Sequence, residues 1–241
     1  MVKKDPVGLS VVIPIFNEVD NIPHLLKNLI KFSQSSKFSH EFILVDGNST
    51  DGTREALKNF SSNPKIKIIF LSESKGYGGD IKEGLKHAHY SFLGWTHADL
   101  QTDISDLEVA FNKIISLPNE TIIKGKRENR KKLESFFTFG MEVVVLYFLK
   151  HYINDINAQP KLFSKNFYNT ISGKFWPNDF SLDLFLLFEA KKKNLTIETI
   201  PVKFNIRQFG EAKGGGSWSS RRKLIQRTFK YVRELSIKIK P

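Results

Sequence analysis

The stretch "LSVVIPIFNEVDNIPHLLKNLIKF", residues 9–32, contains the pattern from which the fold can be predicted. Its first part, residues 9–15, is a nearly continuous apolar run typical of a strand buried on both faces. From residue 21 to residue 32 the apolar residues recur at helical spacing, and Asp20 or Asn21 can cap the helix N-terminus. The stretch therefore predicts a buried strand that leads directly into a helix.

The same alternation of strand and helix continues through the first half of the chain. Further strands are expected at 41–46, 66–71, 91–95 and 121–125, and helices at 52–60, 78–88 and 104–117. Parallel strands need such crossover connections, so the pattern predicts an α/β fold with a Rossmann-like, mostly parallel sheet flanked by helices. In open sheets of this kind, ligands bind beyond the carboxyl ends of the strands.

The pattern changes near residue 126, where we place a functional boundary within a single domain. A basic run at 127–132 precedes the aromatic segment 135–149. A helix at 181–191, a strand-like stretch at 195–206 and a basic helix from about 219 to 238 complete the prediction.

Composition narrows the function classes. The 241 residues include no cysteine, which excludes disulfides and thiolate metal sites. The net charge of +12 favours anionic partners, but the basic residues are dispersed and match no nucleic-acid-binding motif, so we expect none. We expect no signal peptide, because no long apolar run precedes Pro14. We expect no spanning helix either, because Glu142 interrupts the most apolar run, 135–149.

The loops that follow the predicted strands carry acidic and amide groups. Asp46 can either read a base or ribose or simply start a turn. In "HADLQTD", Asp99 and Gln101 can offer oxygen ligands to a divalent cation, with His97 as a nitrogen ligand or as an ordinary loop histidine. Asp103 can cap the helix that follows.

Two glycine-containing stretches are candidates for phosphate binding. "KGYGGD", residues 75–80, lacks the ending of a P-loop, but a helix N-terminus there can face a diphosphate through Lys75, Gly76 and free amides. Arg207, Lys213 and residues 214–216 form a second phosphate-compatible loop. A tight turn and a charged surface loop are the respective alternatives.

Taken together, these stretches resemble the family 2 glycosyltransferases of the GT-A fold, closest to the dolichyl- or polyprenyl-phosphate mannose synthase branch. The resemblance covers residues 9–213 and includes "VVIPIFNEVDNI", "EFILVDGNSTDGT", "KGYGGDIKEGLKHA", "HADLQTD", "GKR", "NAQPKLFSK" and "RQFGEAK", in family order. It implies an inverting hexosyltransferase that uses a nucleotide-diphosphate sugar, either a GDP- or a UDP-sugar, with Mg²⁺ or Mn²⁺.

The resemblance also implies roles for individual residues. Asp46 would read the base and Asp99 would act in catalysis through the cation, held by Asp99, Gln101 and His97. The nucleotide sugar would contact Pro14, Phe16, Glu18, Asp46, Lys75, Gly76, Asp99, Arg207 and Lys213. His97 stands where the family has an aspartate, so the cation site has lost one carboxylate, and a degenerate nucleotide-sugar-binding protein is one alternative.

The acceptor side is expected in residues 127–218, with 1–126 as the nucleotide-sugar and metal half. The resemblance implies that Gln159, Lys161 and Arg127 would contact the acceptor, and that this acceptor would be a polyprenyl or dolichyl phosphate or a similar lipid-linked acceptor, with mannose or glucose as the transferred sugar. If the acceptor is instead a hydroxyl of a cell-surface glycan, Asp183 is the candidate catalytic base, with Asp179 as its competitor.

The C-terminal segment 219–241 is predicted to be a basic amphipathic helix. Its apolar stripe includes Tyr231, Val232 and Leu235, and it can either bind an anionic bilayer or pack on its own domain. We therefore expect a cytoplasmic protein that lies at the inner face of the membrane without spanning it.

Overall fold

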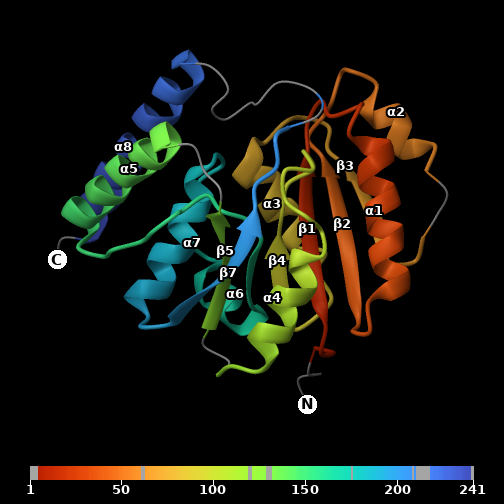
Figure 1. Cartoon of the computed structure of the whole chain (residues 1–241), viewed down its shortest axis with the longest axis horizontal. Helices are drawn as coiled ribbons and strands as arrows, with labels where there is room; N and C mark the ends of the chain where they lie inside the picture. The colour runs from red at the N-terminus through yellow and green to blue at the C-terminus, as the bar shows by residue number, and fades with distance from the viewer. Residues whose placement is uncertain are drawn as a thin grey trace.

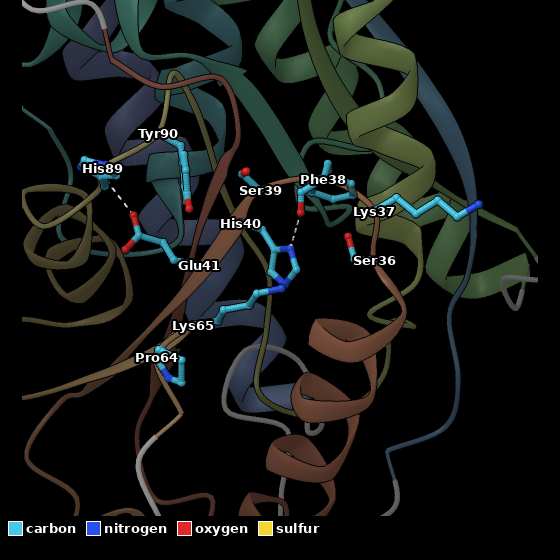
Figure 2. Close-up of a pocket in the computed structure, with 10 residues that line it drawn as sticks. All are labelled: Ser36, Lys37, Phe38, Ser39, His40, Glu41, Pro64, Lys65, His89 and Tyr90. Carbon is cyan, nitrogen blue, oxygen red and sulfur yellow. Dashed lines mark hydrogen bonds between the residues drawn. The ribbon is translucent and has the colours of Figure 1, made fainter.

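The computed structural model describes residues 5–60, 63–118, 121–128, 132–174, 176–207, 209 and 218–239. These residues form a seven-stranded sheet with the order β3-β2-β1-β4-β6-β5-β7 (Figure 1). The strands are β1 (Leu9–Ile15), β2 (His40–Asp46), β3 (Ile66–Phe70), β4 (Phe92–Trp95), β5 (Thr121–Glu128), β6 (Lys161–Ser164) and β7 (Thr196–Lys203). The predicted α/β fold with a mostly parallel sheet is confirmed.

Strand β1 is the point at which the order of strand addition reverses: β2 and β3 extend the sheet on one side of it and β4 on the other. It pairs in parallel with β2 on one side and with β4 on the other, while β3 extends the sheet beyond β2. A crevice forms at such a switch point, beyond the carboxyl ends of the two strands that diverge. The loops after β1 and β4 are therefore the natural walls of a ligand site.

Strand β6 was not predicted from the sequence. It lies between β4 and β5 and is antiparallel to both, whereas β5 and β7 are parallel to each other. All four of its residues are buried, including a lysine at its first position. A four-residue segment that begins with a lysine carries neither the alternation nor the apolar run on which strand prediction depends.

Two apolar cores cover the two faces of the sheet. One lies under α1 (Ile22–Ser35), α2 (Thr53–Lys58) and α4 (Asp106–Ile115). The other is built by α3 (Tyr77–Leu85), α6 (Lys165–Ile171) and α7 (Ser181–Lys192), together with parts of α5 (Lys132–Leu149) and α8 (Trp218–Ile239). Helix α7 is buried along almost its whole length because it is enclosed by the sheet, α6 and α8.

Helices α5 and α8 lie side by side at the margin of the molecule, beyond α7 (Figure 1). Val145 and Leu149 of α5 and Val232 of α8 are buried, and the rings of Phe148 and Phe229 meet edge to face at 5.5 Å. The second interpretation of the C-terminal stripe, packing on its own domain, therefore accounts for Val232. No helix in the described part of the chain combines the length and apolarity needed to cross a membrane.

Candidate functional site

Three loops meet at the carboxyl edge of the sheet, after β1, β2 and β4. Each contains one residue other than glycine with a positive φ: Asn17 at 52°, Asn48 at 65° and Leu100 at 59°. Asparagine tolerates this left-handed region, but leucine rarely adopts it. Backbone strain of this kind persists only where the surrounding structure holds it, and it is concentrated at functional sites.

Glu18, Asp99 and Arg207 form the centre of this edge. Arg207 Nη2 donates to Glu18 Oε2, and Arg207 Nη1 lies 3.8 Å from Asp99 Oδ2. Asn21 Nδ2 also donates to Glu18, at 2.6 Å, so Asn21 uses its side chain here and makes no side-chain capping bond to α1. The guanidinium, from the second half of the chain, thus joins two acidic loops of the first half.

The backbone of the β4 loop holds Asp99 in place. Asp99 Oδ1 accepts a hydrogen bond from the Gln101 amide at 3.1 Å, a turn made possible by the left-handed Leu100 between them. Gln101 is fixed in turn, because its side-chain Nε2 donates to the Asn205 carbonyl at 3.1 Å. Asp103 Oδ1 accepts from the amide of Ser105 at 2.8 Å, and Ser105, two residues further on, is the N-cap of α4 in place of Asp103.

The donor atoms of this loop suit a hard divalent cation. Asp99 supplies a carboxylate, and Gln101 has its amide nitrogen committed to Asn205, which leaves the amide oxygen for a ligand. Within the described residues, no group of three acidic, histidine or cysteine side chains is close enough to hold a metal. A cation here would therefore need further oxygens from its substrate, as Mg²⁺ usually does.

The ring of His97 packs against an aromatic neighbour. Its ring stacks on that of Tyr77, with centroids 5.4 Å apart and planes 26° apart. The predicted role as a third cation ligand is not supported by this placement, which favours the alternative of a structurally engaged loop histidine.

Asp46 lies fully buried at the end of β2. Its Oδ1 accepts from the Ser49 amide at 3.2 Å, as in the turn-initiating interpretation, and its Oδ2 lies 3.3 Å from Arg54 Nε without a well-formed hydrogen bond. Arg54 also donates to Asn48 and to the Leu71 carbonyl. Asp46 Oδ2 therefore keeps unused hydrogen-bonding capacity, but the side chain is 0% exposed, so a nucleobase could reach it only after the surrounding loop moved.

A second buried acid, Asp80 on α3, occupies the space beside Gly47. A Cβ added to Gly47 would lie 2.4 Å from Asp80 Oδ2, so only glycine fits there without displacing the carboxylate. Burial raises the pKa of Asp80 to about 6, the Lys75 amide opposes that shift by donating to the carboxylate, and the charge of Asp46 adds to it.

Asp80→Asn is expected to stabilise the protein at pH 7.5 and to leave its stability at pH 4 nearly unchanged. Because the pKa of Asp80 is raised to about 6, the folded state retains a proton that the unfolded state releases, so stability falls as pH rises from about 4 to about 6. The asparagine avoids that loss, for a gain on the order of 2 kcal/mol at pH 7.5. Urea unfolding at both pH values checks this, with exposed Asp20→Asn as the control; an equal gain at pH 4 contradicts it.

The glycine-rich stretch 75–80 does not present a free helix N-terminus. The amides of Gly78 and Gly79 donate to the Asn178 carbonyl at 2.8 and 3.2 Å, so that carbonyl takes the place predicted for a diphosphate. A Cβ at Gly76 would lie 2.6 Å from the same carbonyl, and Lys75 is paired with Glu83 at 3.1 Å. These glycines permit close packing of two chain segments, and the nucleotide-binding prediction for Lys75 and Gly76 has no geometric support.

Asp183 is at the centre of a buried polar network. Its side chain is 0% exposed and lies 2.9 Å from Lys161 Nζ, itself 0% exposed. Trp95 Nε1 donates to Asp183 at 3.0 Å, and Gln159 Nε2 at 3.2 Å. A carboxylate so enclosed and so paired cannot meet an acceptor hydroxyl in this conformation, which argues against Asp183 as a base and against Gln159 and Lys161 as acceptor contacts.

The remaining predicted residues have simpler surroundings. Pro14 lies in β1 and Phe16 at its carboxyl end, 39% exposed at the candidate crevice. Arg127 pairs with Asp155 and lies over the ring of Phe204, 5.3 Å from its centroid, so much of its donor capacity is used within the protein. Lys213 lies outside the described residues.

Sequence reasoning missed several residues of the site. Arg54, Tyr77, Asp80 and Trp95 all contact predicted site residues, yet the local sequence does not distinguish the first two or Trp95 from other helix or strand residues. A signal was available only for Asp80, since an acid in a glycine-rich stretch is unusual. Its pairing with Gly47 depends on the meeting of two distant segments and cannot be read from spacing.

The sheet order and the loop cluster define the class: this is the GT-A fold of nucleotide-diphospho-sugar transferases, with the loop cluster at the β1–β4 switch point. Residues 10–171 match the family described as glycosyl transferase family 2. The chain belongs to that family.

Curated relatives agree with this assignment. Over 213 residues the chain is 27% identical to the dolichyl-phosphate beta-glucosyltransferase ALG5A of Trichomonas vaginalis, covering 83% of this chain and 66% of that protein. It is 25% identical over 225 residues to the dolichyl-phosphate beta-glucosyltransferase of Dictyostelium discoideum, covering 83% and 67%. The chain thus spans about two thirds of the length of these relatives.

Solved structures share the fold at low identity. A glucosyl-3-phosphoglycerate synthase of Mycobacterium tuberculosis, solved with Mn²⁺, UDP and glucosyl-3-phosphoglycerate, superposes with a TM-score of 0.72 at 12% identity, over 98% of this chain and 81% of that one. The mannosyltransferase PcManGT of Pyrobaculum calidifontis, solved with GDP-Man and Mn²⁺, gives 0.63 at 15% identity, over 98% and 74%.

Proposed function

We propose that this protein transfers a hexose, glucose or mannose, from a nucleotide-diphosphate sugar to a polyprenyl or dolichyl phosphate. The observation that carries this proposal is the Glu18–Arg207–Asp99 cluster at the β1–β4 switch point, which places a guanidinium beside an acid suited to a cation. The positive charges of the guanidinium and of a cation held by that acid would together suit a diphosphate. The names of the curated relatives support the choice of a lipid phosphate as acceptor.

The burial of Asp183 also favours a phosphate acceptor over a sugar hydroxyl. A hydroxyl needs a base to remove its proton, and the predicted base is fully buried and paired with Lys161. A phosphate is already ionised near neutral pH and attacks the anomeric carbon without that help. The carbon–oxygen bond to the diphosphate breaks as the new bond to the acceptor oxygen forms, with inversion at the carbon.

Asp99 and Gln101 are the residues proposed to hold Mg²⁺ or Mn²⁺. When bound, the cation would neutralise charge that builds on the leaving diphosphate. Arg207 supplies positive charge on the same side, and its ion pair with Glu18 fixes its direction before substrate arrives. Asp46 and Asp80 are proposed to line the base end of the crevice.

A donor and acceptor screen tests the proposal. The full chain is supplied with Mn²⁺ and with UDP-glucose, GDP-mannose or other sugar nucleotides, and each is offered polyprenyl phosphate or a glycan acceptor. We expect transfer to polyprenyl phosphate from one donor and little hydrolysis without acceptor. Transfer to glycan hydroxyls alone, or binding without turnover, contradicts the proposal and supports one of the two alternatives, a glycan transferase or a degenerate binding protein.

We also propose that helices α5 and α8 bind the cytoplasmic face of an anionic membrane. Helix α5 exposes Val143, Leu146 and Tyr147, the last at 68%, and α8 exposes Phe229 beside Lys230 and Arg233. Apolar and aromatic side chains next to basic ones are typical of a surface that enters the headgroup region of anionic lipid. Glu142 of α5 is buried and accepts from the Asp155 amide at 2.8 Å, in the loop that follows the helix, so it faces away from this surface.

The double substitution Leu146→Glu and Tyr147→Glu is expected to reduce binding to vesicles of mixed phosphatidylcholine and phosphatidylserine at least about fivefold, because acidic groups replace the apolar ones that would enter the lipid. Flotation of the full chain measures the bound fraction. Val109→Glu is the matched control, since Val109 is 53% exposed on α4, away from the helix pair. Equal loss in the control, or none in the double variant, contradicts the membrane proposal.

A further inference from the structure

Three aromatic rings form a continuous stack between the two halves of the chain. The His97 ring lies 5.4 Å from the Tyr77 ring at 26°, and Tyr77 lies 4.5 Å from Phe180 at 19°. The three residues come from the β4 loop, the first turn of α3 and the N-cap of α7. Nearly parallel rings at these distances attract one another and exclude water between them.

The middle ring of the stack is anchored in the buried polar network. The Tyr77 hydroxyl accepts from Gln159 Nε2 at 3.0 Å and lies 3.5 Å from Asp183 Oδ2. Burial raises the pKa of Tyr77 and the charge of Asp183 adds to that rise, so the hydroxyl keeps its proton. Tyr77 is therefore a fixed platform for His97.

The other end of the stack belongs to the loop that carries Asp99. His97 lies two residues before Asp99, and Gln101 lies two residues after it, with its side chain bound to the Asn205 carbonyl. Between these two attachments, Leu100 has a φ of 59°, a conformation that needs support from outside the loop. The ring of His97, held by Tyr77, provides that support on the N-terminal side of Leu100, and the Gln101–Asn205 bond provides it on the C-terminal side.

We propose that His97 is a positioning residue. Its ring, stacked on Tyr77, fixes the loop that presents Asp99 to the cation, and so holds that loop in a defined position relative to the acceptor half. It acts through the flat ring and not through a nitrogen–metal bond. This inference rests on the proposed function. In the described residues, the absence of any cluster of three histidine, cysteine or acidic side chains agrees with it, because His97 and Asp99 do not converge with a third side chain of those types.

Two substitutions separate a positioning role from a ligand role. His97→Phe keeps a flat ring and removes both nitrogens, whereas His97→Asp removes the ring and provides carboxylate oxygens. Binding of Mn²⁺ to the full chain in the presence of UDP or GDP is measured by electron paramagnetic resonance. We expect His97→Phe to stay within about threefold of wild type and His97→Asp to bind at least about tenfold more weakly. The reverse order, or wild-type affinity in both, overturns the proposal.

A second measurement needs neither nucleotide nor metal. The unfolding midpoint of the apo protein should be close to wild type for His97→Phe and lower for both His97→Ala and His97→Asp, because only phenylalanine preserves the stack. Equal midpoints in all three variants overturn the stacking role. If wild-type protein binds neither UDP nor GDP, the proposed function fails, while the order of the midpoints still decides whether His97 positions its loop.

Discussion

Asp99→Ala is expected to lower the rate of sugar transfer on the order of 100-fold. Asp99 is the one carboxylate in "HADLQTD" that is held at the crevice, with Oδ1 on the Gln101 amide and Oδ2 facing Arg207 at 3.8 Å. Its removal takes away the charged ligand of the proposed cation. Transfer is measured over a range of Mn²⁺ concentrations, and we expect the loss to be partly recovered at high metal.

Asp103→Asn is the matched control for that experiment. Asp103 belongs to the same loop and is exposed, and its side chain bonds only to the Ser105 amide among the contacts described. We expect its transfer rate and metal dependence to stay close to those of wild type. Equal turnover in Asp99→Ala and wild type would remove Asp99 from the cation site, and an equal loss in both variants would point to the loop's conformation in place of the carboxylate.

Lys161→Met is expected to destabilise the protein by roughly 3–5 kcal/mol, because it leaves the buried charge of Asp183 without its cation. Lys161 Nζ lies 2.9 Å from Asp183, both side chains are 0% exposed, and Lys161 also donates to the Ala158 carbonyl at 3.1 Å. Burial lowers the pKa of Lys161, while the charge of Asp183 opposes that shift. Urea unfolding measures the change.

The double variant Lys161→Met, Asp183→Leu is expected to recover most of the lost stability, because replacing both members of a buried ion pair by apolar groups is often neutral. Lys165→Met is the surface control: Lys165 pairs with Asp5, whose side chain is 42% exposed, and such pairs contribute about 1 kcal/mol or less. A loss in Lys161→Met no larger than in this control contradicts the structural role. No recovery in the double variant would point to Trp95 and Gln159 as the groups left unsatisfied.

The strands and helices that could be predicted were those with a strong periodic signal. β1 has the predicted bounds, and β2, β3 and β4 differ by a residue or less at each end. β6 was missed because its lysine can be buried only when its charge is paired with Asp183, 22 residues further on, and no local sequence pattern predicts that pairing. Burial that depends on a distant residue is invisible to periodicity.

The candidate site was predictable as a set of loops but not as a set of contacts. That Glu18, Asp46 and Asp99 reach one edge follows from parallel strands, and the sheet confirms that placement. The roles of individual residues depended on which other groups of the protein already bond to them. The Asn178 carbonyl takes the amides near Gly76, and the Lys161 ammonium takes Asp183, and neither competitor can be located without the fold.

The position of β6 has a consequence for how the chain must be synthesised and folded. Until Ser164 has left the ribosome, β4 has an open side and β5 has neither of the neighbours that flank it in the finished sheet. Exposed edges of this kind recruit strands from other chains. We therefore expect a truncation that stops between β5 and β6 to produce an aggregating fragment, and residues 1–126 not to fold as an independent unit.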